Sequence, residues 1–275
     1  GFGIPYAVLG FTGKAFDKVS FNLSINAAKS GGQLLQQAWF DVKFKEAAQL
    51  RVGKFKTPFS HAYLTTLGET LFPQLPTSLT TAVIMPYTLN AVTPNIGTGF
   101  DLGVELHGLV KDKFGYEIGL FNGTGAAVNT ASKTMSDDWH IPSLLYAGRF
   151  TYMPYGVMPS TQGNPNRLDE KKMLIGVSGS INVESENEST NDTRVGFEWA
   201  LLYHKWYFAA EAYWMNVGFT KRQKINEHYN YVGGYIQGGY FVAPRVQLAA
   251  RYDIMNRNST TKDGLLNMPA VGVNY

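Results

Sequence analysis

The stretch Ala38-Trp-Phe-Asp-Val-Lys-Phe-Lys45 alternates apolar and polar side chains along its whole length. A β-strand has a side-chain period of two, so this pattern puts Phe40 and Asp41 on opposite faces of a strand. Runs of this kind, separated by turns, recur from Gln33 to Tyr275. Most are about ten residues long, which is the length with which a tilted strand crosses a bilayer. The repeated pattern predicts an all-β fold, namely a transmembrane antiparallel β-barrel.

The composition agrees with one β-rich unit across residues 1–275. Charged residues make up 16% of the chain and aromatic residues 14%, whereas soluble domains carry roughly 25% charged residues. A soluble β-sandwich has a similar composition and stays an alternative. The net charge of +3 is small and spread out, which gives no basis for nucleic-acid binding. The absence of cysteine excludes a disulfide framework.

Alternating segments predict thirteen strands, joined by links of unequal length. Short and long links alternate, as expected for periplasmic turns and extracellular loops. Two links depart from this rule, because 154–171 is long where a turn is due and 30–32 is short where a loop is due. The predicted strands are 5–15, 19–29, 33–45, 49–58, 99–110, 114–122, 143–153, 172–184, 193–204, 206–217, 230–242, 245–255 and 266–275.

The alternation of links also fixes the direction of each strand. The first strand would run inward from the extracellular side, and the last would end at the periplasm. Bacterial single-chain barrels have an even number of strands. We therefore expect an odd number of strands outside these residues, at least one of them before Gly1, so that the barrel is incomplete in residues 1–275.

The segment 59–98 is the longest link and contains four prolines. Its stretch 63–71 has a helical pattern. Loops of this length are usually functional or disordered. We expect segment 59–98 to fold inward and constrict the pore; the alternative is a loop that caps the outside or contacts a neighbouring subunit.

Charges of both signs lie on the polar faces of the predicted strands. A water-filled lumen solvates such groups, and rings of charge tune the ion selectivity of a pore. Acidic groups outnumber basic ones, which predicts weak selectivity with a slight preference for cations; the alternative is that these charges pair and brace the wall. The expected pore-lining residues are basic at Lys43, Lys45, Arg149, Arg194 and Arg251, and acidic at Asp41, Asp101, Glu105, Glu117, Glu184, Glu198, Glu211 and Asp253.

Catalytic chemistry has no support in the sequence. The five histidines are scattered over predicted strands and loops, and no H-E-x-x-H motif is present. The glycine-rich stretch 119–125 ends a strand at a loop, with no following lysine or helix, so it is a turn and not a phosphate-binding loop. We therefore expect no enzyme activity, no metal site and no cofactor.

Five blocks of the sequence carry a family resemblance: 50–60, 103–108, 115–125, 147–156 and 238–253. They resemble the phosphate-selective porin O and P family of Gram-negative outer membranes, and the many asparagines and lysines are similar to members from Bacteroidetes. The resemblance implies a multi-pass barrel of about sixteen strands, one of them before residue 1 and two after residue 275. It also implies a homotrimer in the bacterial outer membrane that lets anions or small solutes diffuse across.

Individual residues follow the family pattern only in part. The first block contains Lys54 and Lys56, and the resemblance implies that both reach the pore near the long loop. Named members of the family line the pore with an arginine ladder and a lysine cluster that handle phosphate. The mixed charges here depart from that pattern, so phosphate specificity is not carried over.

The resulting hypothesis is an outer-membrane porin that passes ions, anions such as phosphate among them, and small hydrophilic solutes by passive diffusion. Its expected partners are the lipid bilayer, these solutes and further copies of the chain. The alternative function is a non-conducting structural barrel that is a subunit of a larger outer-membrane assembly and docks other envelope proteins.

Overall fold

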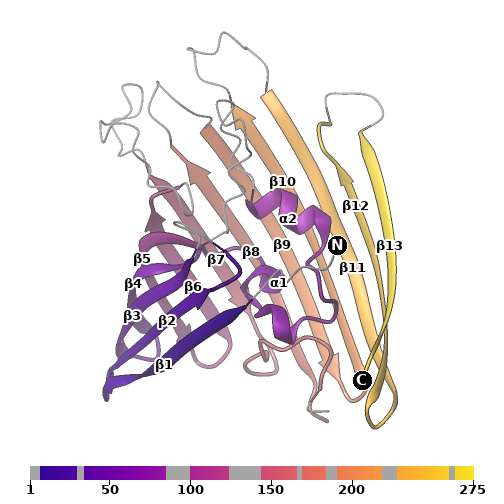
Figure 1. Ribbon diagram of the computed structural model, residues 1–275, viewed down its shortest axis with the longest axis horizontal. Coiled ribbons are helices and arrows are strands. Elements are labelled where there is room, and N and C mark those ends of the chain that lie inside the picture. The colour runs from indigo at the N-terminus through magenta and orange to yellow at the C-terminus, as the bar shows by residue number, and fades with distance from the viewer. Residues whose placement is uncertain are drawn as a thin grey trace.

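The computed structural model describes residues 7–29, 34–84, 100–123, 144–165, 169–183, 191–218, 228–259 and 264–275. These residues form a single thirteen-stranded sheet in which strands adjacent in sequence pair antiparallel. The sheet curls, and the helices lie on its concave side (Figure 1). The prediction of an all-β fold with thirteen strands is confirmed.

The strand bounds lie within a few residues of those predicted from the sequence. The strands are β1 (Val8–Phe16), β2 (Val19–Asn26), β3 (Leu35–Lys45), β4 (Ala48–Lys56), β5 (Phe100–Val110), β6 (Phe114–Phe121), β7 (Leu145–Tyr152), β8 (Lys172–Asn182), β9 (Asn191–Tyr203), β10 (Trp206–Gly218), β11 (His228–Ala243), β12 (Val246–Asn256) and β13 (Leu265–Asn274).

Three short helices lie between β4 and β5: α1 (His61–Leu64), the 3-10 turn η2 (Leu67–Glu69) and α2 (Thr77–Ile84). The first two fall in or near the stretch 63–71 that has a helical pattern, whereas α2 was not expected. Within the described ranges, no helix is long and apolar enough to cross a membrane.

Tight turns join the strands at one end of the sheet. Lys111 and Asp112, between β5 and β6, have φ of 52° and 54°. Positive φ at both central residues is the geometry of the type I′ turn, whose twist matches that of the flanking strands. Such turns fix the register of each hairpin and hence which side chains face inward.

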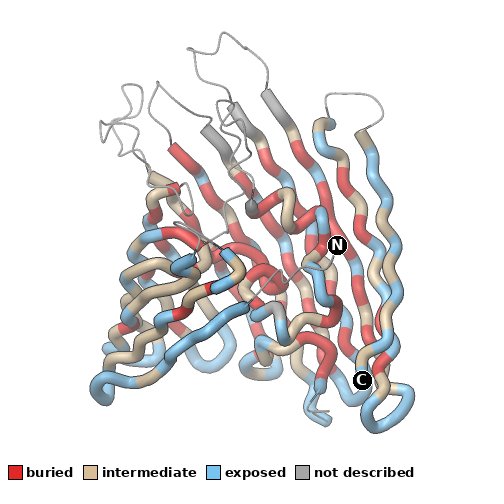
Figure 2. Tube along the Cα trace, viewed as in Figure 1, coloured by how far each residue is buried: buried red, intermediate tan, exposed pale blue. Residues whose placement is uncertain are grey.

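Large apolar side chains cover the outer face of the sheet. Phe150, Val177 and Phe197 lie opposite one another on β7, β8 and β9, and their exposed fractions are 52%, 51% and 48%. The next residue on each strand points inward and is more buried, so burial alternates along the strands (Figure 2). A continuous exposed apolar band is the surface that lipid covers in a membrane barrel.

The inner face of β8 to β12 carries large apolar side chains. Tyr207, Met215, Tyr231 and Met255 project from these strands and are buried. They pack in one hydrophobic cluster with Leu79 of α2, which is 0% exposed. The segment between β4 and β5 supplies the apolar surface that these wall residues need.

β1 and β13 are the two edges of the sheet, each paired with a single neighbouring strand among the described residues. Both strands are mostly exposed, with Phe11 at 58% and Val271 at 87%. The expectation of further strands outside residues 1–275 stays a prediction.

Replacing Val177 by arginine tests the assignment of the outer face. A charged side chain on the lipid face of a membrane barrel costs about 2–4 kcal/mol near the bilayer midplane. We expect Val177→Arg to lower the free energy of unfolding by that amount, measured by denaturant titration in lipid vesicles. Val177→Leu is the control, and equal stability of the two variants would contradict a lipid-facing position.

Candidate functional site

The segment after β4 turns back onto the inner face of the sheet. Its first turn, at Ser60, has a φ of 64°, and the Ser60 hydroxyl accepts a hydrogen bond from Tyr63 N at 3.1 Å. Ala62 N donates to Glu211 Oε1 on β10 at 2.9 Å. The ring of Phe59 packs against that of Tyr213, with 6.1 Å between centroids. A buried carboxylate and an aromatic pair thus hold α1 against the wall.

Two wall residues of opposite charge bind the two ends of α2. Asp253 of β12 accepts a hydrogen bond from Thr77 N at 2.6 Å. Arg194 of β9 donates to the carbonyl oxygens of Ala82 and Val83 at 2.9 Å and 2.7 Å. The terminal amides and carbonyls of a helix lack intrahelical partners, and the helix dipole favours an anion at the N-terminus and a cation at the C-terminus. Both charges are therefore placed to stabilise α2 inside the lumen.

Further contacts hold α2 along its length. Tyr231 Oη donates to Ser78 O at 2.7 Å, and Arg251 Nη1 donates to Gln74 O at 2.8 Å just before the helix. A Cβ at Gly233 would overlap the Tyr231 hydroxyl and crowd Ser78. Glycine at this position lets the helix approach the wall closely.

A second segment enters the lumen from the opposite direction, from the link between β7 and β8. Gln162 N donates to Glu69 O at 2.8 Å, and Gln162 Oε1 accepts hydrogen bonds from Leu71 N at 3.2 Å and Gln237 Nε2 at 2.9 Å. The unusual length of this link in the sequence was the signal of the insertion. We call residues 59–84 and 153–165 together the plug.

A network of charged side chains lines the inner wall of β3, β4 and β5. Arg51 bonds to Asp41 at 2.8 Å and to Glu105 at 3.3 Å, and His107 Nε2 lies 2.8 Å from Asp41 Oδ2. Arg51 pairs in register with both acids, which is why one guanidinium reaches two neighbouring strands. Arg51 also lies over the Trp39 ring, at 4.8 Å from its centroid.

A second network spans β6, β7 and β9. Arg149 Nη1 bonds to Glu117 Oε2 at 2.9 Å, and Arg149 Nε bonds to Glu198 Oε1 at 2.7 Å. A Cβ at Gly176 would overlap the Glu198 carboxylate, so glycine makes room for it. Each network contains one more carboxyl group than guanidinium.

Several expected pore-lining residues contact the plug or these networks. The contacts described above involve Glu105, Arg149, Arg194, Glu198, Glu211, Arg251 and Asp253. Asp101 accepts a hydrogen bond from Gly123 N at 2.5 Å beside the inner wall. Lys56 lies at the end of β4, where its ammonium donates to Tyr63 O and, at 3.1 Å, to Thr65 O.

The other lysines that were expected to line the pore, Lys43, Lys45 and Lys54, lie away from the plug. Lys43 pairs with Glu46 at the turn after β3, and Lys45 is exposed at the same end. Lys54 pairs in register with Leu102, which is 53% exposed on the outer face. Strand alternation therefore does not put Lys54 on the inner face, and the family block alone could not show this. Glu184 lies outside the described residues.

His61 and Tyr63 of α1 are buried at the centre of the plug. Burial lowers the pKa of His61 to about 3, and the nearby Arg149 guanidinium contributes to the shift. The imidazole is therefore uncharged near neutral pH. Burial also raises the pKa of the Tyr63 hydroxyl. In the part of the chain that the structure describes, no group of His, Asp and Glu is placed to hold a metal ion.

The comparison with protein families decides the identity of this barrel. The model of the family described as phosphate-selective porin O and P matches residues 1–275. The chain belongs to this family of porins. The sequence resemblance is thereby confirmed, and this porin is a β-barrel protein of the Gram-negative outer membrane.

A solved porin shares the fold of this porin at low sequence identity. An anion-selective porin from Comamonas acidovorans superposes with a TM-score of 0.63 and 10% identity, covering 99% of this chain and 74% of the other. A loop-deletion mutant of OmpT from Vibrio cholerae gives a TM-score of 0.44 and 14% identity, covering 98% and 89%. A search of curated proteins gave no match.

Removing the Asp253 carboxylate tests the attachment of α2 to the wall of this porin. We expect Asp253→Ala to weaken the helix by about 1–2 kcal/mol, because Thr77 N and Ser78 N lose their acceptor. Hydrogen exchange of the amides of 77–84 should then be about tenfold faster. Asp253→Asn keeps an acceptor and is the control. Unchanged exchange in Asp253→Ala, or equal acceleration throughout the sheet, would refute the role of this carboxylate.

The buried His61 predicts a pH-dependent stability of this porin. Its pKa is about 3 in the folded protein and 6.5 ordinarily, so between these values the unfolded state binds the extra proton. Stability is then complete above about pH 6.5 and falls as the pH drops toward 3. At pH 5 the loss should be about 2 kcal/mol, since each unit below the unfolded pKa costs about 1.4 kcal/mol.

Denaturant titrations at pH 7 and pH 5 measure this loss. Carboxylates elsewhere contribute equally to the loss of stability of the native protein and of His61→Gln between pH 7 and pH 5. The difference between these two losses therefore measures the contribution of His61. The variant should lose less stability on acidification, and the same loss in both proteins would show that His61 does not titrate in this way.

Proposed function

We propose that this porin passes ions and small hydrophilic solutes across the outer membrane by passive diffusion, and that it does so as a homotrimer. The observation that carries the proposal is the plug, which is hydrogen-bonded to the inner wall beside two charged networks. The plug narrows the lumen along β8 to β12. The wall of β3 to β7 keeps the polar and charged surface that a hydrated solute needs.

The constriction in this proposal is the segment 59–98, of which residues 59–84 contribute to the plug. The proposed pore-lining residues are the wall residues that contact the plug or belong to the two charged networks. Arg51 is one of them, since its guanidinium joins Asp41 to Glu105 on the wall. The second inserted segment, 153–165, narrows the passage further from the end of the tight turns.

Weak preference for cations follows from the charges of this wall. The network of Arg149 holds two carboxylates and one guanidinium, and this excess of negative charge favours cations. The family description names phosphate, and one similar structure is named anion-selective. In the described residues, however, Arg194 and Arg251 bind plug carbonyls, and both arginines of the networks bind carboxylates.

Planar-bilayer recording of the purified full-length protein tests the function. We expect stepwise conductance and, in a KCl gradient, a reversal potential that shows modest preference for K⁺. Added phosphate should not reduce the chloride current, because no cluster of uncompensated cations lines the described wall. A reversal potential favouring Cl⁻, together with block by phosphate, would replace this proposal with an anion channel.

Absence of stepwise conductance would refute passive diffusion altogether. Co-purification of another envelope protein at fixed stoichiometry would then support the structural-barrel alternative. Native molecular mass in detergent measures the trimer separately, because a monomeric porin could still conduct.

A further inference from the structure

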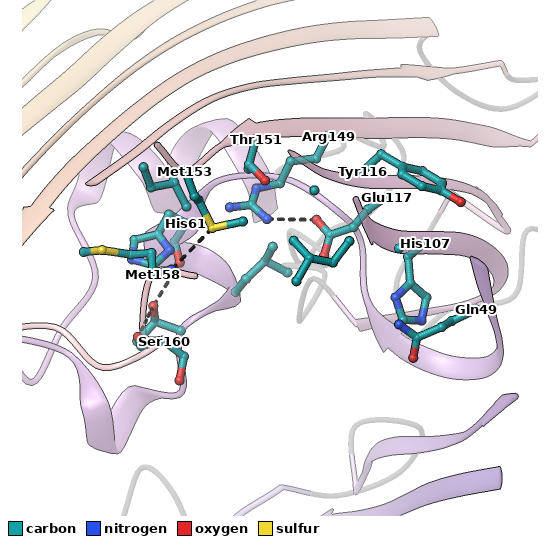
Figure 3. Close-up of a pocket in the computed structure, with 16 residues that line it drawn as sticks. Gln49, His61, His107, Tyr116, Glu117, Arg149, Thr151, Met153, Met158 and Ser160 are labelled. Carbon is teal, nitrogen blue, oxygen red and sulfur yellow. Dashed lines mark hydrogen bonds and ion pairs between the residues drawn. The ribbon is translucent and has the colours of Figure 1, made fainter. Parts of the chain in front are cut away.

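A cavity of about 310 Å³ lies between the plug and the inner wall of β4 to β7. Its volume falls at the lower end of the range for ligand pockets, which is about 300–1,000 Å³. Figure 3 shows side chains from both sides around this cavity, with His61, Met158 and Ser160 from the plug and Glu117 and Arg149 from the wall. The function proposed above does not explain why a pocket of this shape is built here.

One side of the cavity carries a carboxylate. The Glu117 side chain is 28% exposed, whereas that of Arg149 is 10% exposed. The Arg149 guanidinium is shared between Glu117 and the buried Glu198, so its positive charge is already compensated. A ligand that enters the cavity thus meets an excess of negative charge, which favours a cation.

The two histidines of the lining do not reverse this balance. The lowered pKa of His61 keeps that side chain uncharged at neutral pH. The His107 Nε2 atom contacts a carboxylate, Asp41, which adds a further negative group behind the lining. The other charged group packed near this part of the wall, Arg51, is bonded to Asp41 and to Glu105.

The lining of the cavity also contains apolar side chains. Leu64, Met153 and Met158 of the plug and Leu109 and Leu174 of the wall line this space. Methionine and leucine side chains adapt to small hydrocarbon groups. A pocket with apolar walls and a few placed polar groups orients a ligand by those polar groups.

We propose that this cavity binds a small organic amine, with the ammonium group against the Glu117 carboxylate and the hydrocarbon part against the leucine and methionine side chains. The inference deepens the proposed function, on which it rests for its role in passage, by naming a class of solute. An inorganic cation would use the carboxylate but gain nothing from the apolar side chains.

Isothermal titration calorimetry on the detergent-solubilised full-length protein tests the site. The probes are n-butylammonium, butyrate, 1-butanol and K⁺. We expect saturable binding of n-butylammonium alone, weakened about tenfold in Glu117→Gln, because a charge-assisted hydrogen bond is lost. In that variant Arg149 keeps Glu198, and heat-modifiable gel mobility checks that the barrel is folded.

Two further variants separate the pocket from a general effect of charge. Glu170→Gln removes the same charge from an exposed side chain that pairs with Lys172, and it should bind n-butylammonium as the native protein does. Met158→Trp fills the cavity from the plug and should abolish binding without a change of charge. Three results would each overturn the proposal. Butyrate could bind at least as tightly as n-butylammonium, the native protein could fail to bind n-butylammonium, or Glu117→Gln and Glu170→Gln could weaken its binding equally.

The result is distinguishable from failure of the proposed function. If the protein binds n-butylammonium with these effects but shows no stepwise conductance, the amine site stands and passive diffusion fails. If the protein conducts but the native form binds no amine, only the amine site is refuted.

Discussion

The attachment of α2 between Asp253 and Arg194 is the interaction on which the interior depends. Strands of the sheet satisfy one another's backbone groups, but a short helix placed in the lumen leaves amides and carbonyls unpaired at its ends. An acid on β12 and a base on β9 supply the missing partners. With those ends satisfied, Leu79 can pack in the hydrophobic cluster of the wall.

The sequence predicted the strands well because a period of two is a local property of the chain. It also assigned acids and arginines to the polar face of the strands, an assignment that stays a prediction. It did not predict their partners: Arg194 binds Ala82 O and Val83 O, and the separation along the chain is 112 residues for the first bond. The alternation of residues shows on which face of the sheet a side chain lies. It does not show the hydrogen-bond partner of that side chain, which lies in a segment distant in the sequence. For Lys54, a family block suggested the lumen where register indicates otherwise.

The arginines of the inner wall described above bind carboxylates or carbonyl oxygens. A ladder of uncompensated cations would attract anions over the length of a pore. Here the arginines of both networks bind carboxylates, and Arg194 and Arg251 bind plug carbonyls. The inner wall of this porin therefore differs in its charges from such a ladder of cations. Membership of the family determines the fold, whereas the charges of the individual wall determine which solute is favoured.

The two segments of the plug make the lumen of this barrel resemble the core of a soluble protein. Leu79 and Tyr207, each at 0% exposure, are as buried as core residues elsewhere. In evolution, a substitution that widens the passage on the side of β8 to β12 would also create a cavity and lose stability. The buried strand residues of that cluster come from β8 to β12, so the wall of β1 to β6 carries less of this constraint. New solute preferences should therefore arise by substitutions on that wall, while the plug side stays nearly invariant.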